Sequence, residues 1–487
     1  MATEQSFSLP IQNELMIMTT NKQTRVLIII VTWNKQQYVI DLLNSISILD
    51  YPRESMDIVV VDNASTDNTV ELIQQQFNHV HLICNKENIG GTGGFNTGLA
   101  WAFEQQGYDY LWLLDNDVRV HKNALAELLN VLESQSDVAI AGSTMMQLDF
   151  PYKINEMGAF VDRGNGQLLF NRHKQKVPSL QGKDVDDLIK ADLDLSQIIS
   201  ECQSWMDVDY VAAASLLIRA DVAKEAGLWD DFFIHFDDVA WCQHIAEKGY
   251  RIVVSAQSII WHMSAVTKVP SWILYYDNRN ILYLLEKYGY PGSVARSKKW
   301  TLKKSLYYAL IGKPDISALH INALNDYDQR VKGKKNIVLD SVYQGLDATS
   351  EVLLDNNIKR VLMPWTVNLQ ASNLQHLFIR ALHERKDLHI DFISDPSDSV
   401  SNQPRQLPKS NTIFLPKSKL MRLWVYYRLR NRYDLVIQSD YQAIIPLSWV
   451  AEKILFINYE GISYRKRPSV TNIVELVKTI IKLWRKL

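Results

Sequence analysis

Cysteine is scarce in this sequence, and its three cysteines lie far apart. Cys84, Cys202 and Cys242 show no CxxC spacing within the 487 residues. Neither a disulfide framework nor a zinc ribbon is therefore indicated. A reducing compartment, the cytoplasm, fits this cysteine usage best.

Long apolar runs are also missing. Residues 1–24, expected to be an N-terminal extension, are polar and mixed and lack the apolar stretch of a signal peptide. No later run reaches the roughly 18 apolar residues that a membrane span needs. Integral insertion is therefore not expected, whereas attachment to the inner face of the cell membrane stays open.

Neither positive nor negative charge dominates the chain. Its 52 basic and 54 acidic residues give a formal net charge of −2, which argues against a nucleic-acid-binding protein with a strong positive field. Apolar residues, in contrast, make up 47% of the chain, which is ample for packed cores. A length of 487 residues predicts two or three domains.

Apolar runs and segments of helical periodicity alternate from Arg25 onward. The run Val26–Val31 is continuous and β-branched, like a strand buried on both faces. Helix-like and strand-like segments then alternate as far as Gly142. This repeat predicts an α/β fold with a mainly parallel sheet and helices on both faces.

Polar clusters follow each of the first four predicted strands. They are residues 32–34 (TWN), 62–66 (DNAST), 85–96 (NKENIGGTGGFN) and 115–117 (DND). Ligands of parallel sheets bind beyond the carboxyl ends of the strands, where such loops meet. The four clusters are therefore predicted to line one site.

The fourth cluster holds two aspartates, Asp115 and Asp117, one residue apart. Like charges repel at this spacing, but a shared Mg²⁺ or Mn²⁺ would offset the repulsion and keep positions for phosphate oxygens. A turn with two solvated aspartates is the commoner explanation of an isolated DxD. His262 ends a later apolar run and could add an imidazole ligand, although a lone histidine is more often structural.

A second acidic pair, Asp237 and Asp238, precedes a predicted helix. Such carboxylates can simply cap the helix, or one can act as a general base toward an acceptor hydroxyl. The glycine-rich loop at residues 90–94 lets backbone approach a ligand closely or is only a flexible turn. Arg279 is a candidate for a phosphate contact or for a surface ion pair.

The rest of the sequence predicts an insertion, a linker, a second domain and a C-terminal helix. Residues 149–207 are irregular, with a hairpin near DRGNGQ, and are expected to be an insertion that helps to form an acceptor cleft. A linker at 296–333 would lead to a smaller α/β domain at 334–465, of unknown role. Residues 469–487 predict a basic amphipathic helix that either lies on anionic lipid or docks on the protein core. Its apolar stripe comprises Ile473, Val477, Ile480, Ile481 and Trp484.

Several of these motifs together resemble a known family. VTWNK, VVVDNASTDNT, NIGGTGGFNTGL, LLDNDV, DDVAWCQHIAEKGYRI and WH occur in this order. They resemble the inverting family 2 glycosyltransferases of the GT-A fold and, within that family, most closely the bacterial galactofuranosyltransferases. The resemblance covers about residues 25–290 and implies a GT-A domain at 25–295.

The resemblance also implies roles for the residues of these motifs. A UDP-sugar donor would be held by residues at the strand ends, and Mn²⁺ or Mg²⁺ on its diphosphate by Asp115, Asp117 and His262. Asp238 would be the base, and Asp237 would orient a glycan or lipid-linked acceptor. The donor-binding residues would be Thr32, Asn34, Asp62, Asn63, Gly94, Asn96, Asp115 and Asn116.

Two departures from the family pattern concern specificity. Asn116 stands at the centre of the metal triplet in place of an aspartate, and Ala212–Ala214 stand where galactofuranosyltransferases have tryptophans at the acceptor site. UDP-galactofuranose is the expected donor, with dTDP-rhamnose as its rival. A nucleotidyltransferase and an inactive scaffold are the alternatives of other classes. A homo-oligomer is possible, and no nucleic-acid partner is expected.

Overall fold

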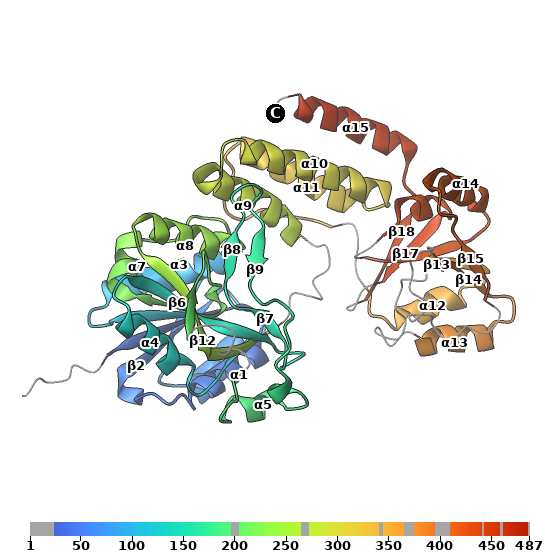
Figure 1. Cartoon of the computed structure of the whole chain (residues 1–487). Coiled ribbons are helices and arrows are strands. Elements are labelled where there is room, and N and C mark those ends of the chain that lie inside the picture. The colour runs from blue at the N-terminus through green and yellow to red at the C-terminus, as the bar shows by residue number, and fades with distance from the viewer. Residues whose placement is uncertain are drawn as a thin grey trace, which may run out of the picture.

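Two α/β parts, joined by a group of helices, make up the chain (Figure 1). The computed structural model describes residues 24–195, 204–263, 272–339, 344–364, 375–394, 410–440, 443–457 and 461–485. The predicted N-terminal extension lies outside this range except for Thr24, as does Cys202.

The first part is built on one large, mainly parallel sheet, as predicted. Its strands run in the order β10-β12-β6-β11-β4-β1-β2-β3, and β1 pairs in parallel with both β2 and β4. β11 is antiparallel to β4 and β6. The bounds are β1 Val26–Thr32, β2 Met56–Asp62, β3 His81–Cys84, β4 Tyr110–Asp115, β6 Val138–Gln147, β10 Trp205–Asp207, β11 Leu216–Arg219 and β12 Arg251–His262.

Helices cover both faces of this sheet and create two cores (Figure 1). In β1, Leu27 and Ile29 belong to one core, whereas Val26, Ile28 and Ile30 belong to the other. The continuous apolar run thus reflects burial on both faces. The helices are α1 Gln36–Ile46, α2 Thr69–Gln76, α3 Gly90–Glu104, α4 Ala124–Ser134, α7 Ala220–Ala226 and α8 Asp237–Glu247.

The irregular insertion contributes short elements beside the sheet. β8 (Ala159–Val161) and β9 (Leu168–Phe170) form the hairpin predicted near DRGNGQ, and β7 (Ile154–Glu156) pairs with β6. A short helix, α5 (Val185–Leu188), follows. The insertion therefore brings residues from outside the βα repeat to the edge of the site.

The segment 296–333, predicted as a linker, is largely helical. α9 (Ile273–Tyr288) is followed by α10 (Ser293–Leu310) and α11 (Pro314–Asp328). Polar serines and threonines on α10 are buried, and Ser305 hydrogen-bonds Ser317 of α11 at 3.0 Å. Close approach of these helices needs small side chains, which apolar periodicity alone does not reveal.

The second part is a smaller six-stranded sheet. Its order is β15-β14-β13-β16-β17-β18, parallel except for β18. The strand order reverses between β13 and β16, as in doubly wound sheets. The elements are α12 Ala348–Leu354, β13 Arg360–Pro364, α13 Gln375–Glu384, β14 His389–Ser394, β15 Thr412–Phe414, α14 Lys419–Leu429, β16 Leu435–Ser439, β17 Lys453–Ile457 and β18 Ile462–Lys466.

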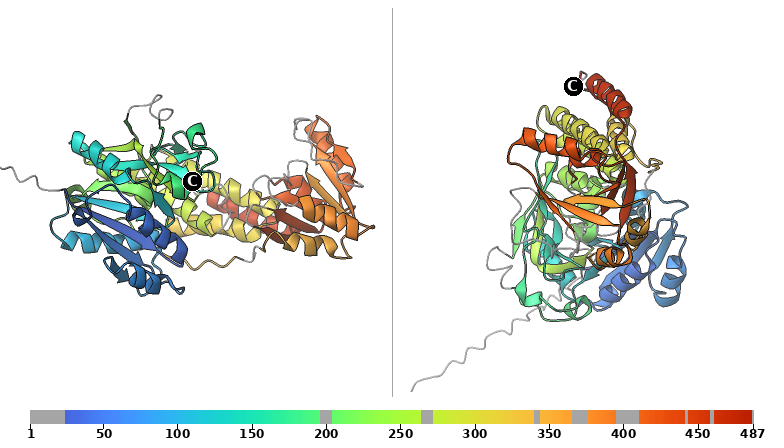
Figure 2. Two further views of the ribbon diagram at one scale, coloured as in Figure 1. Left: turned by 90° about the horizontal axis from the view of Figure 1, so that it is seen from below. Right: turned by 90° about the vertical axis from the view of Figure 1, so that its right-hand side faces the viewer.

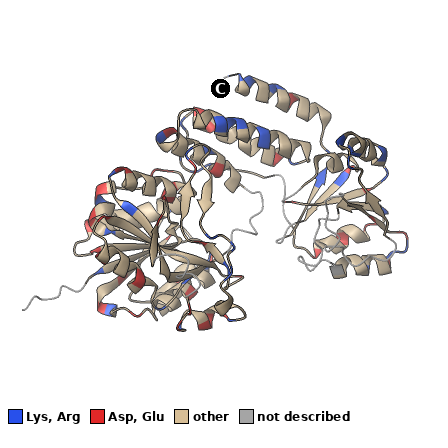
Figure 3. Cartoon of the chain, in the orientation of Figure 1, with Lys and Arg blue, Asp and Glu red and all other residues tan. Residues whose placement is uncertain are grey.

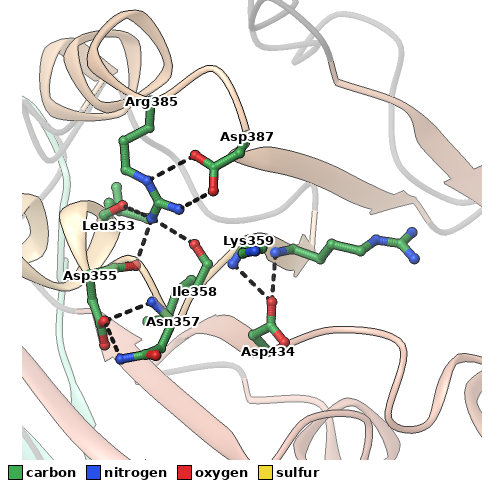
Figure 4. Close-up of polar contacts among 9 residues, drawn as sticks. Leu353, Asp355, Asn357, Ile358, Lys359, Arg385, Asp387 and Asp434 are labelled. Atoms are coloured by element: carbon green, nitrogen blue, oxygen red, sulfur yellow. Dashed lines mark hydrogen bonds and ion pairs between the residues drawn. The ribbon is translucent and has the colours of Figure 1, made fainter.

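A buried arginine fixes one end of this second sheet (Figure 4). Arg385 is 7% exposed and donates to the carbonyl oxygens of Leu353, Asp355 and Ile358 while it pairs with Asp387. One guanidinium thus satisfies the last carbonyls of α12 and the turn that leads into β13. Such a site suits the five-donor fork of arginine and not the point charge of lysine.

A buried ionic cluster, which we call the junction cluster, connects α11 to the second sheet. Lys313 pairs with Asp440, and Arg465 pairs with Asp315 at 3.0 Å. The side chains of Lys313 and Asp440 are both 0% exposed. Two basic groups thus face two acidic groups, and burial lowers the pKa of Lys313 to about 7. Figure 2 shows the second sheet at the end of the helix group, where this cluster lies.

The predicted C-terminal helix forms as α15 (Val470–Trp484) and returns to α10. Ile480 is buried in the first core, and Leu476 and Leu483 pack against it. The predicted apolar stripe is therefore divided: Ile480 docks on the protein, whereas Ile481 and Trp484 are 46% and 42% exposed. Within the described part of the chain, no helix is long and apolar enough to cross a bilayer.

Candidate active site

The loops after β1 and β2 are tied together at the carboxyl edge of the first sheet. Asn34, in a left-handed conformation with φ 48°, accepts a hydrogen bond from the amide of Thr66 at 2.6 Å. Its own amide donates to Ser65 Oγ. Asn34 therefore shapes the pocket wall at the point where the two strands end side by side.

Asp62 has one oxygen available for a ligand. Its side chain is 1% exposed, and Oδ2 accepts from the amide of Ser65 at 2.8 Å. Among the described residues, Oδ1 has no hydrogen-bond partner. Because a buried carboxylate oxygen without a donor is costly, this atom is a natural acceptor for an N–H or O–H group of a bound molecule.

Asn63, Gly94 and Asn96 make contacts within the protein. The Asn63 amide donates to the Gly90 carbonyl and accepts from Asn85, each at 2.8 Å. Asn96 forms two hydrogen bonds with the backbone of Trp229. A Cβ on Gly94 would lie 2.3 Å from Val31, so this glycine lets α3 pack closely on β1. All three hold the walls of the pocket in place.

The three predicted metal ligands converge. β5 (Val118–Val120) follows directly after the DND turn and pairs antiparallel with β12, which places His262 opposite Val118. His262 Nε2 consequently lies 3.0 Å from Asp117 Oδ1 and 3.9 Å from Asp115 Oδ2. One ligand atom from each of the three lies within 4.8 Å of the others. Two carboxylates and an imidazole in this arrangement fit a hard divalent cation such as Mn²⁺.

Asn116, the residue between the two aspartates, connects the metal turn to the first strand. Its side-chain amide donates to Thr32 Oγ1 at 3.0 Å. An aspartate here could not donate in its ionised form. The substitution that departs from the family pattern therefore has a structural role: it joins the ends of β1 and β4.

Asp237 and Asp238 begin α8 inside the same site. The Asp237 carboxylate accepts from Thr92 Oγ1 of α3 at 2.5 Å. Asp238 accepts from the amide of Ala213 at 3.2 Å and from that of Val239 at 2.8 Å. Ala213 thus contacts Asp238 through its backbone N–H group, and this contact does not depend on the alanine side chain.

Burial changes the acidity of these groups. Desolvation raises the pKa of Asp237, against the hydrogen bond from Thr92. Desolvation and the neighbouring charge of Asp237 raise the pKa of Asp238 well above its usual value, and Asp115 adds to this effect. A carboxylate with a raised pKa is a stronger base than an exposed one, so Asp238 has the property that proton abstraction requires.

Two site residues, Glu156 and Tyr210, are not evident from the sequence. Burial raises the pKa of Glu156 to about 7, while His262 lowers it. Burial also raises the pKa of Tyr210, with further contributions from Glu156, Asp238 and Asp115. Tyr210 thus lies within electrostatic range of both Asp238 and Asp115, and Glu156 within range of His262 and Tyr210. They come from the insertion and from the segment before η3 (Ala213–Ser215), where no motif marks them.

The loop before Asp237 is held in a strained conformation. Phe233, His235 and Phe236 all have positive φ, between 64° and 70°. Asn280, fully buried on α9, donates to the carbonyls of Phe232, Ile234 and His235. The surrounding structure thus imposes the conformation that places Asp237 and Asp238.

Arg279 has a different role from either one expected. It is 0% exposed and donates to the carbonyls of Phe232 and Gly333 at 3.0 and 2.8 Å. Because Arg279 is buried, it cannot form a surface ion pair. Its guanidinium is bonded to backbone carbonyls and is therefore not available to a phosphate. Arg279 holds the same loop as Asn280.

Comparison with known proteins finds a family and several relatives that match part of the chain. Residues 27–182 match the family described as glycosyl transferase family 2. Galactofuranosyltransferase GlfT2 of Mycolicibacterium smegmatis is 23% identical over 247 residues, which is 50% of this chain and 37% of that protein. TarS of Staphylococcus aureus, a poly(ribitol-phosphate) β-N-acetylglucosaminyltransferase, is 29% identical over 116 residues, covering 23% of this chain and 20% of that protein.

The matched segments are shorter than the relatives themselves. The chain spans well under half the length of either one. A crystal structure of S. aureus TarS aligns at 16% identity with a TM-score of 0.40, over 63% of this chain and 49% of that chain. The chain therefore carries a family 2 glycosyltransferase domain, related to that of the galactofuranosyltransferases.

Proposed function

We propose that the chain transfers a sugar from a nucleoside diphosphate donor to an acceptor hydroxyl with inversion at the anomeric carbon. The observation that carries the proposal is the placement of Asp238, a half-buried carboxylate of raised pKa at the start of α8, within electrostatic range of Asp115 in the metal triad. A general base on the acceptor side and a cation site on the donor side are the two parts that a single displacement needs.

The donor would lie across the carboxyl ends of β1, β2 and β4. Thr32, Asn34 and Asn116 border this edge, and Asp62 Oδ1 would accept from the base or ribose. Asn63, Gly94 and Asn96 support the pocket through the contacts described above. This arrangement fits a nucleotide lying along the sheet edge with its diphosphate toward Asp115.

Asp115, Asp117 and His262 would hold Mn²⁺ or Mg²⁺. Such a cation neutralises charge on a departing diphosphate. The remaining steps belong to the protein. Asp238 takes the proton of the acceptor hydroxyl, whose oxygen then attacks the anomeric carbon, and the nucleoside diphosphate leaves from the opposite face. Asp237, oriented by Thr92, lies beside the acceptor.

UDP-galactofuranose is the first choice of donor because of the similarity to galactofuranosyltransferases. dTDP-rhamnose is the rival. The acceptor would be a growing cell-surface glycan or a lipid-linked intermediate, met at the cytoplasmic face of the membrane. The Ala212–Ala214 segment, which lacks tryptophans, favours an acceptor different from that of the relatives.

Measuring UDP and dTDP release from a panel of donors tests the proposal. Asp238→Asn should lose transfer by about a thousandfold or more while it still binds donor, because the amide keeps the shape but cannot take a proton. Asp117→Ala should weaken Mn²⁺ binding. Transfer that persists in both variants would point to an inactive scaffold, and pyrophosphate release from nucleoside triphosphates would indicate a nucleotidyltransferase.

Contact with the membrane through residues 469–487 is part of the proposal. Val470, Val474, Ile481 and Trp484 of α15 are 42–61% exposed and recur at spacings of four, seven and three, so they share one face. The face that packs on α10 is separate. Val474→Ser with Ile481→Ser should shift the protein from the membrane fraction to the soluble one, and deletion of α15 would in addition disturb the first core.

A further inference from the structure

Helix α14 has two apolar faces, and the second sheet covers only one of them. Arg422, Val425, Tyr426 and Leu429 recur at i, i+3, i+4 and i+7, and all four are buried or half-buried. Leu420, Leu423, Trp424 and Tyr427 recur at the same spacing. Residues at this spacing share a stripe of the helix, so the second set forms a separate face.

This second set, the outer face of α14, is strongly exposed. Leu420 is 80% exposed, Tyr427 73%, Trp424 55% and Leu423 54%, and Met421 at its border is 56% exposed. Single exposed apolar residues are common on soluble proteins, but a contiguous group of large ones indicates an interaction surface. The outer face therefore calls for a partner that removes it from water.

The charge around the outer face indicates the nature of that partner. Residues 417–433 contain six basic residues and no acidic one: Lys417, Lys419, Arg422, Arg428, Arg430 and Arg432. Figure 3 shows blue basic positions along α14. Arg428 lies over the Trp424 ring, 4.8 Å from its centroid, so cation and aromatic ring occupy one surface. The partner must therefore present apolar groups and negative charge on the same surface.

We infer that α14 is an interfacial helix that docks on an anionic lipid bilayer. Its outer face would enter the boundary between headgroups and acyl chains while the flanking arginines and lysines contact lipid phosphates. A second copy of this chain would bring two cationic helices together, which repulsion opposes. Nucleic acid would match the charge but would not remove a leucine-rich stripe from water.

The inference is independent of sugar transfer and of α15. It rests on a different helix, in the second domain, and its assay contains neither donor nor acceptor. In the structure α14 packs against η6 (Ile445–Trp449), whereas α15 packs on α10. Each helix can therefore be altered while the other keeps its surroundings.

Flotation of the full-length protein with vesicles tests the inference. Vesicles of phosphatidylglycerol mixed with phosphatidylcholine should bind the protein, and pure phosphatidylcholine should bind it much less. Leu420→Ser with Tyr427→Ser should lower the partition coefficient on anionic vesicles about tenfold or more. Arg428→Gln and Arg430→Gln should lower it about fivefold for each charge removed, and added salt should weaken this contribution.

A matched control comes from the first domain. Leu228→Ser with Tyr290→Ser removes the same side chains from positions that are 49% and 61% exposed but isolated, and it should leave flotation unchanged. Circular dichroism and a thermal melt check that every variant is folded. Because Leu420 and Tyr427 touch little of the protein, both doubles should melt near the wild-type temperature.

Three results would overturn the inference. Unchanged flotation of the α14 double variant would assign lipid binding to another surface, with α15 the next to alter. Equal binding to neutral vesicles would remove the role of the basic residues. A wild-type dimer in solution that becomes monomeric in the Leu420 and Tyr427 variant, without vesicle binding by either form, would make the outer face a contact between copies of the chain.

Discussion

Replacing Lys313 by methionine should weaken the attachment of the second domain far more than the loss of any exposed ion pair. Lys313 and its partner Asp440 are both 0% exposed, so the substitution leaves a carboxylate buried without its cation. Removing one member of such a pair costs about 3–5 kcal/mol. The second cation of the junction cluster, Arg465, is already paired with Asp315 and is not free to compensate.

The assay is thermal unfolding of the full chain, read by circular dichroism and by limited proteolysis between the two parts. A loss of 3 kcal/mol corresponds to a midpoint about 10 °C lower for a unit of this size. Lys453→Met is the matched control, because it removes a lysine from a half-exposed ion pair with Asp355 in the second domain. It should lower the unfolding midpoint much less.

The double variant Lys313→Met with Asp440→Leu separates two explanations of the loss. Replacing both charges by apolar groups is often neutral, because neither is then left unpaired. We expect most of the lost stability to return. If Lys313→Met alone melts with the wild type, or if the double variant is less stable than the single one, the argument from an uncompensated buried charge is refuted.

Three further predictions concern the active site. Burial raises the pKa of Glu156 from its ordinary value of 4.5 to about 7, so the folded state keeps this proton to higher pH than the unfolded state does. Stability should therefore fall as pH rises through this interval. Glu156→Gln should add up to about 3 kcal/mol at pH 8 but little at pH 4, measured by urea unfolding in a chelator. Asn280→Ala removes three hydrogen bonds to the strained loop, leaving only Arg279 on the Phe232 carbonyl, and should lower kcat by about tenfold or more, whereas unchanged kcat would show that the loop holds its own shape. Gly90→Ala should have a similar effect, since φ is +79° and a Cβ would lie 2.0 Å from the Phe233 carbonyl oxygen; wild-type kinetics would contradict this.

Much of the first domain was predictable because parallel strands buried on both faces have a clear sequence pattern. The carboxyl ends of β1, β2 and β4 then had to lie together, which placed Thr32, Asp62 and Asp115 at one edge. His262 was a candidate ligand by residue type and strand-end position, but nothing in the sequence except the family resemblance placed it beside the two aspartates. Its position depends on the antiparallel pairing of β12 with β5, a contact between residues far apart in the chain.

Other features depended on tertiary contacts that periodicity does not encode. Glu156 lies in a segment without a motif, and Thr92 lies in the glycine-rich motif without a predicted role; only the packed structure brings them near His262 and Asp237. Arg279 looked like a phosphate ligand by residue type, but burial decided its role. For α15, the helical periodicity predicted the helix correctly. It did not show which of two neighbouring apolar stripes packs on the protein.

The return of α15 to α10 joins the two domains a second time. The chain leaves the first part after α11 and comes back from β18, so two covalent connections and the junction cluster bridge the same gap. Two domains joined by a single segment can rotate about that segment. Here a second connecting segment and the buried junction cluster restrict this rotation. Any structural change at the carboxyl edge of the first sheet is then expected in the loops of the first domain and not in the position of the second domain.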